Sequence, residues 1–164
     1  MDIIGPKLAP YNPTNIDAVN IALDLLNISS IDTLYDLGCG DGRLLVEALQ
    51  RLQGNIRCVG IEYDKNLCDK AIDNLSKQNL LTDKISILHA NVLDVSITDA
   101  TAVFVYLVPE GMRAMRETLL HIISNGGRIV TYVFSIPDVQ PSQVVIYKQS
   151  TKLYLYCNER EREG

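Results

Sequence analysis

The sequence predicts an α/β fold in which a doubly wound, mostly parallel sheet of seven strands ends in an antiparallel hairpin. Three observations support this prediction. Short apolar runs alternate with segments whose apolar residues recur at helical spacing, which indicates a parallel sheet covered on both faces. A glycine-rich turn follows the first apolar run. Two β-rich stretches, joined by a few polar residues, come last and indicate a hairpin.

The predicted elements follow one another in a regular order. Strands are expected at residues 33–37, 56–61, 84–89, 101–108, 128–134, 143–148 and 152–157. Helices are expected after Thr14, from about Arg43 to Gly54, from Lys65 to about Leu80, and from Pro109 to Asn125. The stretch between Phe134 and Gln143 leaves no room for a standard helix. The sixth strand must therefore lie at some distance from the fifth, or pair through the seventh.

A proline-rich lead-in, residues 1–14, precedes the first predicted helix. Thr14 is the expected N-cap of that helix, with Asp17 as a weaker capping-box partner. One apolar stripe at helical spacing is expected to face the sheet, formed by Ile16, Val19, Leu23 and Leu26.

Length and charge limit the possible classes of protein. A chain of 164 residues suits one compact domain, expected over residues 1–158, with a charged tail at 159–164. The net charge is −5 and no basic stripe is visible, which argues against a nucleic-acid partner, because binding to phosphates depends largely on Lys and Arg. A basic partner, such as a protein surface that carries lysine, fits this charge better.

The cysteines and the N-terminus predict a protein of a reducing compartment. Cys39, Cys58, Cys68 and Cys157 show no CxxC spacing and no clustered histidine, so neither a metal site nor a disulfide framework is expected. No apolar run approaches the roughly 20 residues that span a bilayer. Without a signal or transit peptide pattern, a soluble cytoplasmic protein is expected.

The turn after the first predicted strand reads Gly38-Cys39-Gly40-Asp41-Gly42. Glycines there allow positive φ angles and a close approach of backbone N–H groups to a ligand, although a tight strand-to-helix turn needs glycine as well. The spacing is GxGxG, whereas dinucleotide-binding loops read GxGxxG. Asp36 and Asp41 would repel a pyrophosphate but suit a sulfonium and an ammonium group. The loop therefore favours S-adenosylmethionine over NAD.

Polar residues after the second and third strands are the next candidates. Glu62 lies roughly 20 residues past the glycine loop, where an acid can bind both ribose hydroxyls. Asp64 is the expected cap of the next helix. Tyr63 could lie along the adenine face or simply pack. Asn91 could accept from the adenine amino group beside the Val92 backbone, or form an ordinary Asn turn.

In this order and spacing, these segments resemble the class I, seven-β-strand methyltransferases, whose fold is Rossmann-like. The motif from Asp36 to Gly42 looks like their first motif, Glu62 like their ribose acid and Asn91 like their adenine contact. Together with Arg43, Pro10-Tyr11-Asn12-Pro13-Thr14 is similar to the small archaeal and mitochondrial protein lysine methyltransferases. By that resemblance, Tyr11 and Thr14 would line the cofactor site and the lysine channel. The resemblance implies S-adenosyl-L-methionine as cofactor and a protein with an accessible lysine as partner.

The end of the fourth predicted strand is expected to face the transferred methyl group. Tyr106 could shape the acceptor channel, or be a core tyrosine. Glu110 could guide a cation, but it reads better as an acid in the first turn of a helix. The segment lacks the Asn/Asp-Pro-Pro-aromatic motif of methyltransferases that modify nucleobase amines. A small-molecule methyltransferase and an inactive binding module remain the alternatives, while the loop spacing argues against an NAD-dependent oxidoreductase.

Overall fold

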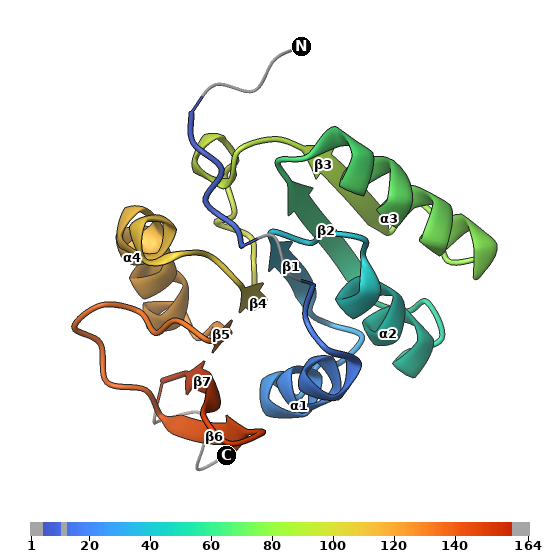
Figure 1. Cartoon of the computed structure of the whole chain (residues 1–164). Coiled ribbons are helices and arrows are strands. Elements are labelled where there is room, and N and C mark those ends of the chain that lie inside the picture. The colour runs from blue at the N-terminus through green and yellow to red at the C-terminus, as the bar shows by residue number, and fades with distance from the viewer. Residues whose placement is uncertain (1–4, 11–12, 159–164) are drawn as a thin grey trace.

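The computed structural model describes residues 5–10 and 13–158 of the chain (Figure 1). It contains the strands β1 (Thr33–Leu37), β2 (Arg57–Glu62), β3 (Ile85–His89), β4 (Ala102–Val105), β5 (Arg128–Tyr132), β6 (Gln143–Tyr147) and β7 (Thr151–Tyr156). The helices are α1 (Ile16–Leu26), α2 (Arg43–Arg51), α3 (Lys65–Lys77), α4 (Pro109–Ser124) and a short 3-10 turn, η1 (Val92–Asp94). None of these helices is long and apolar enough to cross a bilayer.

All seven strands form one sheet, in the order β3-β2-β1-β4-β5-β7-β6. The first five strands run parallel, whereas β7 lies antiparallel to both β5 and β6. This confirms the predicted doubly wound sheet with a terminal hairpin, and the sixth strand pairs through the seventh. The strand order reverses between β1 and β4. In open α/β sheets, ligands bind beyond the carboxyl ends of the strands at such a switch point.

Two apolar layers hold the sheet between its helices. On one face, α1, α2 and α3 pack against alternate strand residues such as Leu34, Cys58 and Ala102. On the other face, α4 covers the intervening residues, among them Leu37 and Val103. In Figure 1 the three early helices lie together, away from α4. This alternation explains why the strands read as continuous apolar runs.

The start of α1 differs from the prediction. Asn15, and not Thr14, is the N-cap, because its side-chain oxygen accepts a hydrogen bond of 2.9 Å from the Asp17 amide. Val19, Leu23 and Leu26 are buried as expected, but Ile16 is 49% exposed. Helical side chains tilt toward the N-terminus, so the first residue of the helix projects past the sheet that its neighbours contact.

A partly buried ion pair fixes the amino-terminal edge of the sheet, opposite the switch point. The Arg128 guanidinium donates to both oxygens of Asp32, at 3.1 and 2.8 Å. The Thr101 hydroxyl and the Ser29 amide donate to the same carboxylate. Burial acts to raise the pKa of Asp32, but these hydrogen bonds outweigh it and hold the pKa below its usual value.

Candidate functional site

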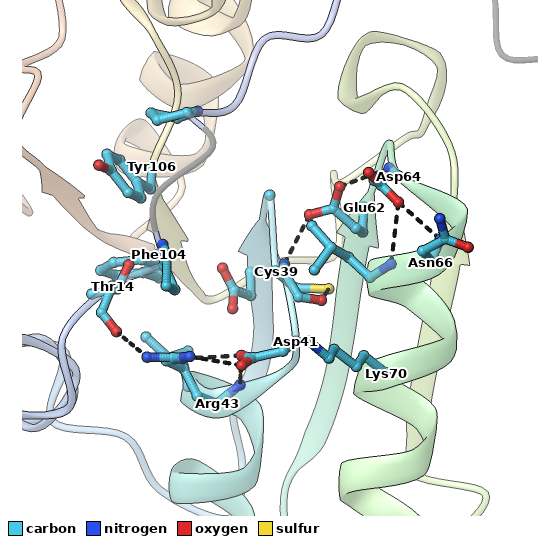
Figure 2. Close-up of a pocket in the computed structure, with 17 residues that line it drawn as sticks. Thr14, Cys39, Asp41, Arg43, Glu62, Asp64, Asn66, Lys70, Phe104 and Tyr106 are labelled. Carbon is cyan, nitrogen blue, oxygen red and sulfur yellow. Dashed lines mark hydrogen bonds and ion pairs between the residues drawn. The ribbon is translucent and has the colours of Figure 1, made fainter.

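A cavity of about 460 Å³ opens at the carboxyl ends of β1, β2 and β4, at the switch point (Figure 2). It is lined by Pro10, Pro13, Thr14, Asp36, Gly38, Cys39, Gly40, Asp41, Arg43, Leu44, Glu62, Asp64, Asn66, Leu67, Lys70, Phe104 and Tyr106. The predicted glycine loop thus forms one wall. Phe104 and Tyr106 lie across the cavity from Glu62 and Asp64.

The glycine loop lies in the cavity wall with its backbone exposed to a ligand. A Cβ atom at Gly40 would meet nothing within 4 Å, so the loop borders open space there. Gly42 has φ +82° and packs against Ala71 of α3, where a Cβ atom would come within 3.1 Å of the alanine side chain. Backbone conformation and close approach therefore both require glycine at position 42.

Glu62 organises the loop from the end of β2. Its residue is only 2% exposed, and its two carboxylate oxygens accept from the Gly40 and Asp64 amides, each at 2.8 Å. A carboxylate oxygen can accept more than one hydrogen bond, so these contacts leave acceptor capacity for ribose hydroxyls. Asp64 caps α3 as predicted, because its side chain accepts from the Asn66 and Leu67 amides.

Asp36 forms a buried acidic floor beneath the loop. The residue is 3% exposed and lines the cavity. Within residues 5–10 and 13–158, its carboxyl group makes no hydrogen bond or ion pair. Burial, with the charges of Glu62 and Asp41, raises the pKa of Asp36 to about 8. Such a group favours a cationic ligand, because a nearby positive charge stabilises its ionised form. A sulfonium or ammonium group fits this floor.

Asp41 has a different environment from Asp36. The Arg43 guanidinium donates to both of its oxygens, at 3.0 and 2.7 Å. Hydrogen bonding from Arg43 lowers the pKa of Asp41, against the effect of burial. Its charge is therefore already balanced by Arg43, and a role of Asp41 toward the cofactor stays a prediction.

Aromatic side chains form the side of the cavity opposite Glu62. The Tyr106 ring meets the Tyr132 ring edge to face, with centroids 4.9 Å apart, and Phe104 lies 6.4 Å from Tyr132. Burial raises the pKa of Tyr106, which keeps its phenol neutral. Thr14 lines the cavity as predicted. Tyr11, the other candidate for the acceptor channel, lies outside the described residues.

Three predicted adenine contacts lie beneath the lead-in and do not line the cavity. The Tyr63 hydroxyl donates to the Gly5 carbonyl at 2.8 Å. The Asn91 amide oxygen accepts a hydrogen bond from the Leu93 amide, as expected for the ordinary Asn turn that was the alternative prediction. Val92 is buried in the same apolar cluster as Leu8. A role for these three residues toward adenine stays a prediction.

Sequence reasoning missed several residues of the cavity wall. Phe104 of β4 precedes Tyr106 by two residues in the predicted fourth strand, so strand alternation could have identified it. Lys70 reaches the cavity from the second turn of α3 without any local sequence signal. Glu110 lies exposed in the first turn of α4, which agrees with the prediction of an acid in the first turn of a helix.

Comparison with known proteins identifies the chemistry of this site. The model of the ANTKMT methyltransferase domain matches residues 36–143, which run from the acid of β1 to the start of β6. The chain belongs to the ANTKMT methyltransferase family. It is a class I, S-adenosylmethionine-dependent methyltransferase, and the predicted family and cofactor are confirmed.

The names of individual relatives of this methyltransferase describe different activities. A protein-lysine N-methyltransferase of Saccharolobus islandicus is 31% identical over 150 residues, which cover 90% of this chain and 92% of the relative. A crystal structure of an RNA methyltransferase from Salinibacter ruber, in complex with S-adenosyl-L-homocysteine, has a TM-score of 0.81 and 30% identity. The similarity covers 88% of this chain and 92% of the Salinibacter chain. A carboxy-S-adenosyl-L-methionine synthase of Helicobacter pylori is 26% identical and is covered over 62% of its length.

Proposed function

We propose that this methyltransferase acts on the ε-amine of a lysine in a partner protein. The observation that carries the proposal is the division of the cavity into two chemically different sides. Glu62 and the glycine loop form one side, and Phe104 and Tyr106 form the other. Asp36 lies between them on β1, beside Phe104 of β4. The likeness to the protein-lysine N-methyltransferase of Saccharolobus islandicus, which extends over most of both chains, supports this choice.

The acidic side suits the cofactor. We assign the ribose hydroxyls to Glu62, the cationic part to Asp36, and the backbone contacts to Gly38, Cys39 and Gly40. When bound, S-adenosylmethionine supplies a methyl group on a sulfonium, and transfer to an amine leaves S-adenosylhomocysteine and one proton. Holding donor and acceptor in line is the main catalytic task of the protein in such a displacement.

The aromatic side suits the acceptor. A lysine that enters between Tyr106, Phe104 and the prolines of the lead-in leaves water, and this desolvation lowers the pKa of its amine. The neutral amine has the lone pair that attack requires. Tyr106, held by its edge-to-face contact with Tyr132, fixes the direction of approach. Between β5 and β6 the described chain has no helix that could enclose a small substrate, which favours a side chain presented by a large partner.

The identity of the labelled molecule tests the proposal. The protein is incubated with methyl-labelled S-adenosylmethionine and cell lysate, and the products are treated separately with protease and ribonuclease. We expect protease-sensitive label, located on a lysine ε-amine by mass spectrometry. Label on RNA, for which the Salinibacter relative is named, or on a small metabolite or arginine, would overturn the lysine acceptor. Glu62→Gln serves as the control with impaired cofactor binding.

The pH profile gives a second measurement. At saturating cofactor, the rate is expected to rise from neutral toward alkaline pH, because the acceptor lysine must lose its proton before it can attack. A rate that stays flat across this range would argue against an amine acceptor.

A further inference from the structure

Arg43, the first residue of α2, connects two walls of the cavity that come from distant parts of the chain. Its Nε and Nη2 donate to the Asp41 carboxylate of the glycine loop, at 3.0 and 2.7 Å. Its Nη1 donates to the Thr14 carbonyl at 3.0 Å (Figure 2). All three residues line the cavity. One planar guanidinium thus bridges the cofactor loop and the segment that leads into α1.

The loop end of this bridge is fixed from α3. The Asn74 side chain donates to the Asp41 carbonyl at 2.9 Å, and Gly42 packs against Ala71. Since Glu62 also accepts from the Gly40 amide, a ligand that contacts this loop acts on a segment held at several points. Arg43 extends this network toward the lead-in.

The other end of the bridge lies at the start of α1. Thr14 directly precedes Asn15, the N-cap, whose side chain accepts from the Asp17 amide and from the Tyr147 hydroxyl of β6, at 2.9 and 3.0 Å. Thr14 also follows Pro13, which lines the cavity. The position of the Thr14 carbonyl therefore affects both the first turn of α1 and the cavity wall near Phe104.

We propose that Arg43 is a positioning residue that couples cofactor binding at the glycine loop to ordering of the acceptor-side segment at Thr14. The inference rests on the proposed function, since it takes the lead-in as the acceptor side. Binding that restricts the loop restricts Thr14 through the shared guanidinium, so a later ligand meets an already ordered wall. Lysine cannot replace arginine here, because an ammonium group cannot reproduce the planar fork that binds both partners at once.

Arg51 provides a matched control on the same helix. It also ties α2 to α1, donating to the Asp24 carboxylate at 2.7 Å and to the Asn20 side chain at 2.8 Å. These bonds lie one helix length away from the cavity, and neither partner lines it. Arg51→Met therefore removes a tie between α2 and α1 and leaves the cavity wall intact.

Hydrogen exchange with S-adenosylhomocysteine as the probe tests the coupling without any acceptor. In the wild type and in Arg51→Met, binding of the probe should slow exchange of the backbone amides of residues 14–17 about 5-fold or more. That is the lower end of typical coupling free energies between sites. In Arg43→Met and Arg43→Lys the probe should still bind and protect the loop amides around Gly40, with less than about 2-fold slowing at residues 14–17.

Two results would overturn the inference. Equal slowing at residues 14–17 in the Arg43 variants would show that the guanidinium does not carry the effect. A wild type that binds the probe without slowing at these residues would show that there is no coupling. Label on RNA in the lysate experiment would remove the lysine acceptor but leave this exchange result untouched, so failures of the two proposals are distinguishable.

Discussion

Protonation of Asp36 should control how tightly the cofactor binds. In the free protein, burial and the charges of Glu62 and Asp41 raise the pKa of this carboxyl group to about 8. A cation above it stabilises the ionised form, so binding near neutral pH must release the proton. Asp36→Asn keeps the shape of the side chain but can neither hold nor release this proton.

The structure sets the size of the effect. With a pKa of about 8 in the free protein and an ionised carboxyl in the complex, affinity for S-adenosylmethionine, which carries both the sulfonium and the ammonium, should fall almost tenfold per pH unit below 8. Between pH 7.5 and pH 6 the loss is about 25-fold, and over this range the ligand's own ammonium stays mostly protonated. In Asp36→Asn the affinity should be weaker and nearly independent of pH.

The folding stability should change with pH in the opposite direction to the cofactor affinity. Between about pH 4 and pH 8 the folded protein keeps a proton on Asp36 that the unfolded chain has released. Stability from this group therefore falls as pH rises, by about 1.4 kcal/mol per unit at most. Because Asn carries no proton to release, Asp36→Asn should gain stability relative to the wild type steadily as pH rises from 5 to 8.

Isothermal titration and urea denaturation across pH 5 to 8 measure both effects on the same two proteins. A wild-type affinity that does not change with pH, or equal pH slopes in the wild type and in Asp36→Asn, would refute the reasoning. Such a result would mean that Asp36 is ionised in the free protein or does not meet the cofactor cation.

Three further predictions concern other parts of the molecule. Glu62→Ala should weaken S-adenosylmethionine binding about 5- to 150-fold by isothermal titration, and unchanged affinity in a folded variant would contradict the ribose assignment. Asp32→Asn should cost about 2–4 kcal/mol in urea denaturation and leave cofactor affinity unchanged, because it breaks the partly buried pair with Arg128. Since the pKa of Asp32 is lowered, the wild type should lose this contribution as pH falls below about 4. Tyr106→Leu and Tyr11→Ala should each lower turnover about 10- to 100-fold with a smaller change in cofactor affinity, and a parallel modest fall in turnover, affinity and melting temperature would indicate packing alone.

The parts of the fold that local sequence signals specify could be predicted. The strands of the sheet are short apolar runs, and the hairpin follows from two β-rich stretches and a missing helix. The turn before α2 contains glycines because Gly42 has a positive φ and packs closely against Ala71. Glu62 was predicted by its distance along the chain from that turn. Each of these features depends on neighbours in the sequence or on sheet geometry.

Contacts between distant segments could not be predicted. Nothing near Tyr63 or Asn91 in the sequence shows that the lead-in covers them, because that contact depends on where Gly5 lies in three dimensions. The predicted fifth strand also ends two residues early. Val133 has φ +69°, and the Phe134 amide bonds to the Tyr132 carbonyl, so the strand turns sharply at a residue type that disfavours this conformation. Tertiary structure overrides local preference at this position.

The place of β7 between β5 and β6 has a consequence for synthesis on the ribosome. The free edge of β5 is covered only when residues 151–156 emerge, after the 133–150 segment has been made. At typical rates of elongation, that interval is roughly one to four seconds. During it, an apolar strand carries unpaired backbone groups that can recruit another nascent chain. Slower decoding between β5 and β7 should therefore lengthen this exposure and make the nascent chain more prone to association.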